Sequence, residues 1–351
     1  EAGVNHNGDA DMAYQLIDLA TDAGADAIKF QTFKAENLVT QAACKAPYQT
    51  LTSNAEESQF QMLKALELSS DLHHKLLKYT KQQNIDFLST PFDIDSLNFL
   101  SDDLQLPAIK LSSGDLTNAP LLYEVGKKRS YVILSTGMGT MDEIRAALGM
   151  LLIGYFKQKI VEPLFEHAIH VYEKHKEHAY LKNSVSLLQC TSEYPANYAD
   201  INLRVMDTLR ETFQLEIGLS DHSDGIIIPI AAVSRGAEII EKHITLDKSL
   251  PGPDHKASLS PQELHDMVSA IRNVEMAMGS GVKQPCESEQ KNIAVVRKGV
   301  YARSNIRKDE LLNSGNITVK RPENGLSPYD YWRCLGKPAE QDYAADDALS
   351  A

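Results

Sequence analysis

Polar side chains that could do chemistry follow the ends of several short apolar runs in this sequence. Lys29 and Lys110 stand at the ends of two such runs, and the hydroxyl groups at the ends of others belong to Thr90, Ser113, Ser135 and Ser220. A lysine ammonium is a compact positive charge that suits phosphate, and hydroxyl groups add further hydrogen-bond donors. If the runs are strands whose ends meet, these residues predict a site for a phosphorylated anion.

Two histidines, His222 and His243, follow neighbouring apolar runs. Two neutral imidazoles with added oxygen ligands suit a divalent transition ion such as Mn²⁺, and Zn²⁺ or Fe²⁺ would also fit. Two ordinary polar histidines are the alternative. Glu1 and Asp254 add carboxylates that could transfer protons in the same place.

The elements that must position these groups alternate between strand and helix. A helical pattern over residues 12–23 ends at Gly24, and similar patterns separate most of the apolar runs. Counting a stub at Glu1, eight strands are predicted, the others being residues 27–30, 85–88, 108–111, 131–134, 185–188, 216–219 and 238–240. Such alternation predicts an α/β protein with a parallel sheet, and eight strands favour a closed (β/α)₈ TIM barrel over an open sheet. In that barrel the strand ends meet at one mouth.

The domain boundaries follow changes of pattern along the chain. The barrel is predicted over residues 1–280, with a charged helical insert at about 145–182, and we expect residues upstream of the Glu1 stub. Residues 281–293 are polar, include one proline and show no periodicity, which predicts a linker. Residues 294–351 have a compact β-like pattern and form a second domain, small enough that its own core would be marginal.

Composition narrows the class of function. The 351 residues carry a formal net charge of −13, which argues against a broad surface for nucleic acid or for an anionic membrane. No apolar run is long enough to span a bilayer, and the first residues show no signal-peptide pattern. The four cysteines are scattered without a CxxC pair, which is typical of reduced thiols and predicts a cytoplasmic protein.

At these positions the sequence resembles the sialic acid synthase family, the phosphoenolpyruvate-dependent N-acylneuraminate synthases. The motifs that carry the resemblance are EAGVNHNG, AIKFQTFKAE, FLSTPFD, KLSSGDL, ILSTGM, QCTSEYP, GLSDHS, IIEKHITLD and PGPDHKASL, and the tail KGVYARSNIRKDELL…NITVKRPENGLSP is similar to the antifreeze-like (SAF) domain of that family. The resemblance implies a TIM barrel followed by a β-rich SAF domain. It also implies a domain-swapped homodimer and a divalent metal, with Mn²⁺ expected and Mg²⁺ or Co²⁺ as alternatives.

The resemblance also assigns roles to individual residues. It places Lys29, Thr90, Lys110, Ser113, Ser135 and Ser220 around phosphoenolpyruvate, and it makes His222 and His243 the metal ligands. The implied catalytic groups are Glu1, Lys29, Lys110 and Asp254. The implied sugar-side groups are Gln31, Tyr194, Asp254 and Arg321, the last delivered by the neighbouring subunit. Ser192 departs from the pattern, because some members have Asn there, and the insert at 145–182 is absent from several members.

The expected function is therefore condensation of phosphoenolpyruvate with N-acetylmannosamine, which releases phosphate and forms N-acetylneuraminate. An alternative substrate is the 2,4-diacetamido-6-deoxymannose analogue, which would give N,N'-diacetyllegionaminate; the motifs do not separate the two. A Schiff-base pyruvate aldolase using Lys110 and a non-catalytic carbohydrate-binding protein are more remote alternatives.

Overall fold

A computed structural model describes residues 1–46, 49–50 and 57–350. The chain divides into two compact units, Glu1–Met278 and Gly279–Ala351. Each unit has its own buried apolar cluster, so each is described by itself.

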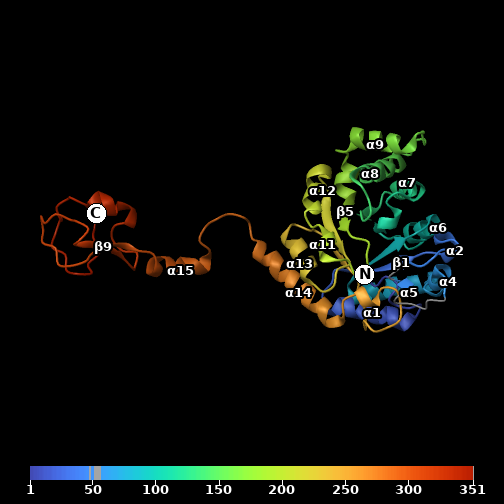
Figure 1. Cartoon of the computed structure of the whole chain (residues 1–351), viewed down its shortest axis with the longest axis horizontal. Helices are drawn as coiled ribbons and strands as arrows, with labels where there is room; N and C mark the ends of the chain where they lie inside the picture. The colour runs from blue at the N-terminus through green and yellow to red at the C-terminus, as the bar shows by residue number, and fades with distance from the viewer. Residues whose placement is uncertain (47–48, 51–56, 351) are drawn as a thin grey trace. The chain divides into compact units, whose positions relative to one another are not determined.

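Parallel strands form the centre of the first unit. They are β1 (Ala27–Thr32), β2 (Asp86–Pro91), β3 (Ala108–Leu111), β4 (Tyr131–Ser135), β5 (Val185–Cys190), β6 (Glu216–Asp221) and β7 (Ile240–Lys242). β1 pairs with β2, and β3 to β7 pair in sequence order, all in parallel. Figure 1 shows helices around the outside of these strands. The unit is an α/β fold with a curled parallel sheet.

The first residues connect the two outermost strands of this arrangement. Gly3 forms a parallel bridge with Phe30 of β1, and the Ala2 amide donates to the Lys29 carbonyl over 2.9 Å. On the other side, the Ile244 amide, just beyond β7, donates to the Glu1 carbonyl over 2.9 Å. Residues 1–3 therefore occupy the position between β7 and β1 that was predicted for the strand stub.

Several strands extend beyond their apolar runs. Strand β7 was predicted at residues 238–240, but the ladder continues through Glu241 and Lys242. Polar residues at these positions do not end the strands, because their side chains find buried partners across the sheet. The polar residues singled out above therefore lie within the strands as well as just after them.

Helices connect the strands and cover the sheet. Those of the first unit are α1 (Ala10–Asp22), α2 (Ala35–Leu38), α4 (Gln59–Ala65), α5 (Ser70–Gln83), α6 (Ile94–Asn98), α7 (Ala119–Lys128), α8 (Met141–Tyr155), α9 (Leu164–His175), α10 (Ala179–Ser184), α11 (Tyr198–Ile201), α12 (Val205–Phe213), α13 (Ile227–Ser234) and α14 (Pro261–Met278). Side-chain caps explain where several begin. Asp9 accepts from the Met12 amide at the start of α1, for example, and Thr140 and Glu143 form a capping box at the start of α8.

The predicted insert at 145–182 begins inside α8 rather than at an element boundary. Residues 146–154 of α8 are all buried, so this helix belongs to the core, and α9 packs on its outer side. Two glycines make the packing close. A Cβ at Gly149 would overlap the Ala168 carbonyl of α9, and one at Gly154 would overlap the Tyr123 carbonyl of α7.

The second unit is smaller and built on short strands. It contains α15 (Glu287–Val296), β8 (Gly299–Ala302), β9 (Ile317–Lys320) and α16 (Tyr331–Cys334), with β8 and β9 antiparallel. Its core gathers Val300, Ile306, Ile317 and Tyr343. The helix α15 differs from the prediction of an aperiodic linker at 281–293. None of its residues is buried, so it lacks the apolar face that would have given a periodic signal.

Among the described residues, no helix combines the length and the apolar character needed to cross a membrane. All four cysteines are free: Cys190 and Cys334 are buried, and Cys44 and Cys286 are exposed.

Candidate active site

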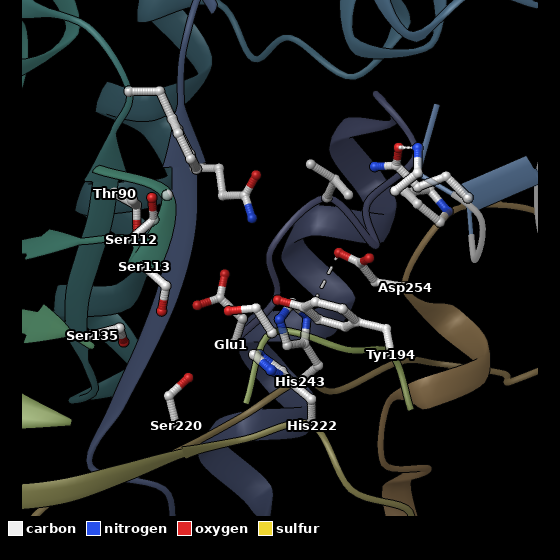
Figure 2. A pocket seen from close by; sticks show the side chains of 18 of the residues that line it. Glu1, Thr90, Ser112, Ser113, Ser135, Tyr194, Ser220, His222, His243 and Asp254 are labelled. Carbon is white, nitrogen blue, oxygen red and sulfur yellow. Dashed lines mark hydrogen bonds and ion pairs between the residues drawn. The ribbon is translucent and has the colours of Figure 1, made fainter. Parts of the chain in front are cut away.

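Most of the residues singled out in the sequence line one cavity of about 460 Å³ in the first unit. Figure 2 shows several of them facing a common space at the carboxyl ends of the strands. The predicted site residues that line this cavity are Glu1, Lys29, Gln31, Thr90, Lys110, Ser113, Ser135, Tyr194, Ser220, His222, His243 and Asp254. Arg321 belongs to the second unit, where its side chain is exposed.

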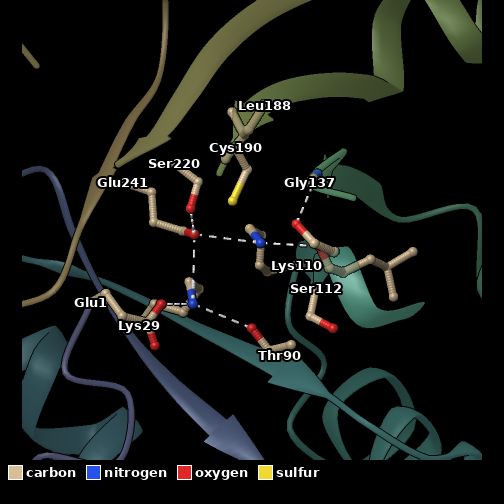
Figure 3. A network of polar contacts seen from close by, with 12 residues as sticks. Glu1, Lys29, Thr90, Lys110, Ser112, Gly137, Leu188, Cys190, Ser220 and Glu241 are labelled. Atoms are coloured by element: carbon tan, nitrogen blue, oxygen red, sulfur yellow. Dashed lines mark hydrogen bonds and ion pairs between the residues drawn. The ribbon is translucent and has the colours of Figure 1, made fainter. Parts of the chain in front are cut away.

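The charged part of the cavity, called the floor here, consists of Lys29, Thr90, Lys110, Ser220 and Glu241 (Figure 3). The Lys29 ammonium pairs with Glu1, lies 3.5 Å from a Glu241 oxygen and donates to the Thr90 hydroxyl over 3.3 Å. Burial lowers the pKa of Lys29 to about 8, because a charged ammonium loses solvation there. Lys29 is therefore still mostly charged at neutral pH.

Glu241 links the two lysines. One of its oxygens lies 3.5 Å from the Lys110 ammonium and accepts from the Ser220 hydroxyl over 2.7 Å. Burial opposes ionisation of Glu241, but Lys110 and Lys29 outweigh it and hold its pKa well below the usual range. Its contacts with both ammonium groups are longer than the 2.7–2.9 Å of a good charge-assisted hydrogen bond. Lys110, which also donates to the Leu111 carbonyl over 3.0 Å, therefore keeps donor capacity for an anion that enters the cavity, whereas Lys29 also pairs with Glu1.

Hydroxyl groups surround the floor on neighbouring strands. The Ser113 hydroxyl, after β3, accepts from the Gly137 amide over 3.0 Å. The Ser135 hydroxyl, at the end of β4, is buried and has no hydrogen-bond partner. An unpartnered buried hydroxyl costs free energy, so Ser135 is a group that a bound anion would satisfy.

The two predicted metal-ligating histidines do lie together. The ring centroids of His222 and His243 are 5.5 Å apart, and the Tyr194 ring is 4.0 Å from that of His222. The His222 Nδ1 donates to the Thr191 carbonyl over 2.8 Å, so Nε2 is the ring nitrogen left to face a ligand. Burial opposes protonation of His222, but its contact with Cys190 outweighs burial and raises the pKa of the ring. The His243 Nδ1 is buried without a hydrogen-bond partner, and burial lowers the pKa of His243 well below its ordinary value, so its ring is neutral.

Each histidine has one property of a metal ligand. The ring of His243 is neutral, as a ligating imidazole must be, and the carbonyl that holds Nδ1 of His222 leaves Nε2 as its ligating nitrogen. Within the described ranges, no group of three or more His, Cys, Asp or Glu residues surrounds one metal position. A metal held by His222 and His243 would therefore take its remaining ligands from water or substrate oxygens, as in open catalytic sites.

Two carboxyl groups border the histidines. An Asp254 oxygen lies 3.8 Å from the His243 Nδ1, and burial raises the pKa of Asp254 to about 6. Glu1 pairs with Lys29 at the boundary between floor and histidines. A carboxyl group that titrates near neutral pH can both accept and donate a proton.

The family follows from comparison with known proteins. The NeuB family model matches residues 16–283, more than half of the chain. This chain belongs to the NeuB family.

Relatives of this NeuB family member include proteins named as synthases. It is 45% identical to an N,N'-diacetyllegionaminic acid synthase of Campylobacter jejuni over 99% of this chain and 97% of that protein. It is 34% identical to the human N-acetylneuraminate-9-phosphate synthase over 99% of this chain and 90% of that protein. A crystal structure of an N-acetylneuraminic acid synthetase from Leptospira borgpetersenii matches with a TM-score of 0.65 and 34% identity, covering 83% of this chain and 88% of that one.

Other cavity residues of this NeuB family member were missed in the sequence. Glu241 could have been found, because it precedes His243 by two positions on a strand and so shares its face. The cavity also has an apolar side, called the rim here, formed by Val4, Leu38, Met62, Leu63, Leu66 and Phe92. Most of the rim lies in or beside α2 and α4, for which the sequence predicted no site residue.

The rim stands above the floor along the strands. Thr90 and Phe92 both line the cavity from the end of β2, and two residues of extended chain span about 7 Å. Phe92 packs edge-on against Phe33, whose neighbours Val4, Met62 and Leu66 are buried with it. The lining of the cavity therefore changes from polar and charged at Thr90 and Lys29 to apolar at Phe92.

Proposed function

We propose that this protein condenses phosphoenolpyruvate with an open-chain 2,4-diacetamido-6-deoxymannose to form N,N'-diacetyllegionaminate and phosphate. The observation that supports it most is one cavity holding a charged floor, two adjacent imidazoles and an apolar rim. The identity of 45% with a relative named as such a synthase favours this substrate over N-acetylmannosamine.

The floor suits phosphoenolpyruvate. Lys29 and Lys110 would hold its phosphate and carboxylate, and the Ser135 hydroxyl would gain the partner that it lacks. Binding both substrates side by side converts an encounter of two molecules into a reaction within one complex, which contributes about 7–11 kcal/mol in well-oriented cases.

The reaction needs one new C–C bond and one broken C–O bond. C3 of phosphoenolpyruvate attacks the aldehyde carbon, water adds to the cationic C2, and phosphate leaves by C–O cleavage. A divalent ion on His222 and His243, with Mn²⁺ as our first choice, would supply Lewis-acid polarisation of the aldehyde. Asp254 and Glu1 would hold and move protons at the aldehyde oxygen and the attacking water.

The rim suits the end of the sugar chain that carries no hydroxyl at C6. A methyl group against Leu63, Met62 and Phe92 keeps favourable contacts, whereas a C6 hydroxyl against the same side chains would lose water without gaining a partner from them. An apolar pocket rejects an added hydroxyl by no more than about 100-fold, so N-acetylmannosamine should be a slow substrate rather than an inert one.

We further propose that the curled sheet closes as a TIM barrel and that the second unit is an SAF domain. In a homodimer, that unit would bring Arg321 to the partner's cavity. Its exposed aromatic residues Tyr329 and Trp332 provide apolar surface for such an interface.

A substrate panel tests the function directly. The full-length protein with Mn²⁺ and phosphoenolpyruvate is offered the 6-deoxy diacetamido sugar, N-acetylmannosamine or no sugar, and products are identified by mass. We expect the legionaminate mass and one phosphate released per product with the first sugar. Condensation of free pyruvate without phosphate release would instead indicate the Schiff-base aldolase, and no product with any sugar would refute the proposal.

Two variants test the assigned roles. His243→Ala should abolish turnover even at saturating Mn²⁺, and near-wild-type turnover would remove the metal role. Arg321→Ala should raise the sugar KM, and an unchanged sugar KM would contradict a contact delivered by the partner subunit.

A further inference from the structure

A buried ion pair lies beside the two histidines without lining their cavity. Asp221 of β6 and Lys242 of β7 are direct partners in the strand register, and each immediately precedes one histidine, His222 or His243. The Lys242 ammonium is 2.5 Å from an Asp221 oxygen, and both side chains are only 1% exposed.

The pair faces away from the cavity. Successive side chains of a strand point to opposite faces, and Ser220, His222, Glu241 and His243 all line the cavity. Asp221 and Lys242 are absent from that lining, so their side chains lie behind the histidines.

The same pair also holds the backbone that follows His222. Asp221 accepts from the Ser223 amide over 3.0 Å and from the Ser223 hydroxyl over 2.9 Å, while Lys242 donates to the Ser223 carbonyl. His222 is thus held at the residue before it and at the residue after it. Lys242 is the common partner of both attachments and also the residue before His243.

Stability alone is a weak reason for this arrangement. Replacing a buried ion pair by apolar side chains of similar volume often leaves a protein equally stable, because desolvation offsets the attraction. What an ion pair with directed hydrogen bonds adds is one fixed geometry. The groups whose geometry it fixes here are the free Nε2 of His222 and the unpartnered Nδ1 of His243.

We propose that Asp221 and Lys242 are positioning residues that clamp the ends of β6 and β7, setting His222 and His243 at the separation needed to share one divalent ion. This inference rests on the metal role in the proposed function. In this proposal both residues support metal binding through the histidines, without contacting the metal themselves.

The affinity for Mn²⁺ tests the clamp without reference to turnover. Isothermal titration calorimetry of the full-length protein measures Kd for Mn²⁺ in the wild type, Asp221→Asn and Lys242→Met. Changes behind metal ligands commonly weaken affinity 10- to 100-fold, and we expect a rise of that size in Kd for both variants. Lys242→Arg, which keeps the charge and the donors, should recover most of the affinity.

A matched control and a compensated variant separate positioning from folding. Lys176→Met removes an exposed ion pair with Glu173 on α9 and should leave the Mn²⁺ Kd unchanged. The double variant Asp221→Leu/Lys242→Met leaves no uncompensated charge, so it should lose less stability than either single variant, although Ser223 loses its partners. Its Mn²⁺ Kd should nevertheless remain raised about 10-fold or more.

The outcomes distinguish the clamp from the function. A double variant that folds and binds Mn²⁺ with wild-type affinity would overturn the clamp and leave the proposed function intact. A wild-type protein that binds no Mn²⁺ but still forms product would overturn the metal role and the clamp with it. Failure of the single variants to fold would leave the double variant to decide.

Discussion

The floor and the rim of the cavity differ in both chemistry and support. The floor presents Lys29, Lys110 and Glu241 from within strands, where the backbone is fixed by ladders to neighbouring strands. The rim presents Leu38 and Leu63 from two short helices that follow β1. The comparison suggests that the rigid floor carries the reaction and the rim selects the sugar.

The floor and the rim also differ in their need for hydrogen-bond partners. The floor contains charged groups beyond ideal hydrogen-bond distance, since Glu241 is 3.5 Å from both ammonium groups, although Lys29 also pairs with Glu1. The rim consists of side chains that need no hydrogen bond. A substitution in the floor should therefore change how the donor substrate reacts, whereas one in the rim should change which acceptor is preferred.

The largest effect is expected from Lys110→Met. Loss of one preorganised charged donor commonly lowers kcat by about 10²–10³-fold, and kcat/KM for phosphoenolpyruvate should fall by that amount. Steady-state kinetics with the 6-deoxy sugar would show it. Lys128→Met, which removes an ion pair with Asp102 at the surface, is the control and should have wild-type kinetics. Equal kinetics for both variants would contradict the role of the floor.

A pH profile should report Lys29. Its pKa is lowered to about 8 by burial, so the ammonium that binds the anion is present below pH 8 and is lost above it. We expect kcat/KM for phosphoenolpyruvate to fall about tenfold between pH 7 and pH 9. Lys29→Arg keeps its charge at these pH values and should remove the fall, whatever its absolute activity. A fall of the same size in Lys29→Arg would assign the titration to another group.

The rim should show its effect in the ratio of two substrates. Leu63→Asn places an amide where the C6 methyl is proposed to lie, and the preference for the 6-deoxy sugar over N-acetylmannosamine should drop about tenfold. Competition between the two sugars, read by product mass, measures this ratio. Lys64→Asn changes an exposed neighbour on the same helix and should leave the ratio as in the wild type. An unchanged ratio in Leu63→Asn would place the sugar end elsewhere.

The smallest kinetic effect is expected from Val4→Ala. Val4 is 4% exposed and belongs to the packed base of the rim, so losing two methyl groups should reduce the free energy of unfolding by about 1–2 kcal/mol. Urea denaturation measures that loss. The KM for phosphoenolpyruvate should not change, and a rise in it would mean that floor and rim are mechanically coupled.

The same contrast explains how far the sequence was informative. The side chains at the ends of the predicted strands had to converge once the strands were parallel, and Lys29, Lys110, His222 and His243 all line the cavity. Glu241 was missed because it was counted as the polar end of a strand, although β7 continues through it. Leu38 and Met62 could not be recognised, since an apolar residue on a short helix has the same signature whether it faces a core or a ligand.

Boundaries were less predictable than the site for a related reason. The exposed helix α15 lies where a linker was expected, because a helix without a buried face has no apolar period to detect. The predicted insert began inside α8, because the charged residues that follow α8 obscured the boundary between this core helix and the outer helix α9.

The glycines of α8 have a consequence for how this protein can vary. At Gly149 and Gly154 the backbone of one helix rests directly on carbonyl groups of its neighbours, so even a methyl group would wedge the layers apart. Helix α9 is therefore in direct backbone contact with α8 and is not held by its connecting loop alone. Insertions and deletions should be tolerated in the connection between α8 and α9. The contact surfaces at Gly149 and Gly154, in contrast, have no room for a larger side chain.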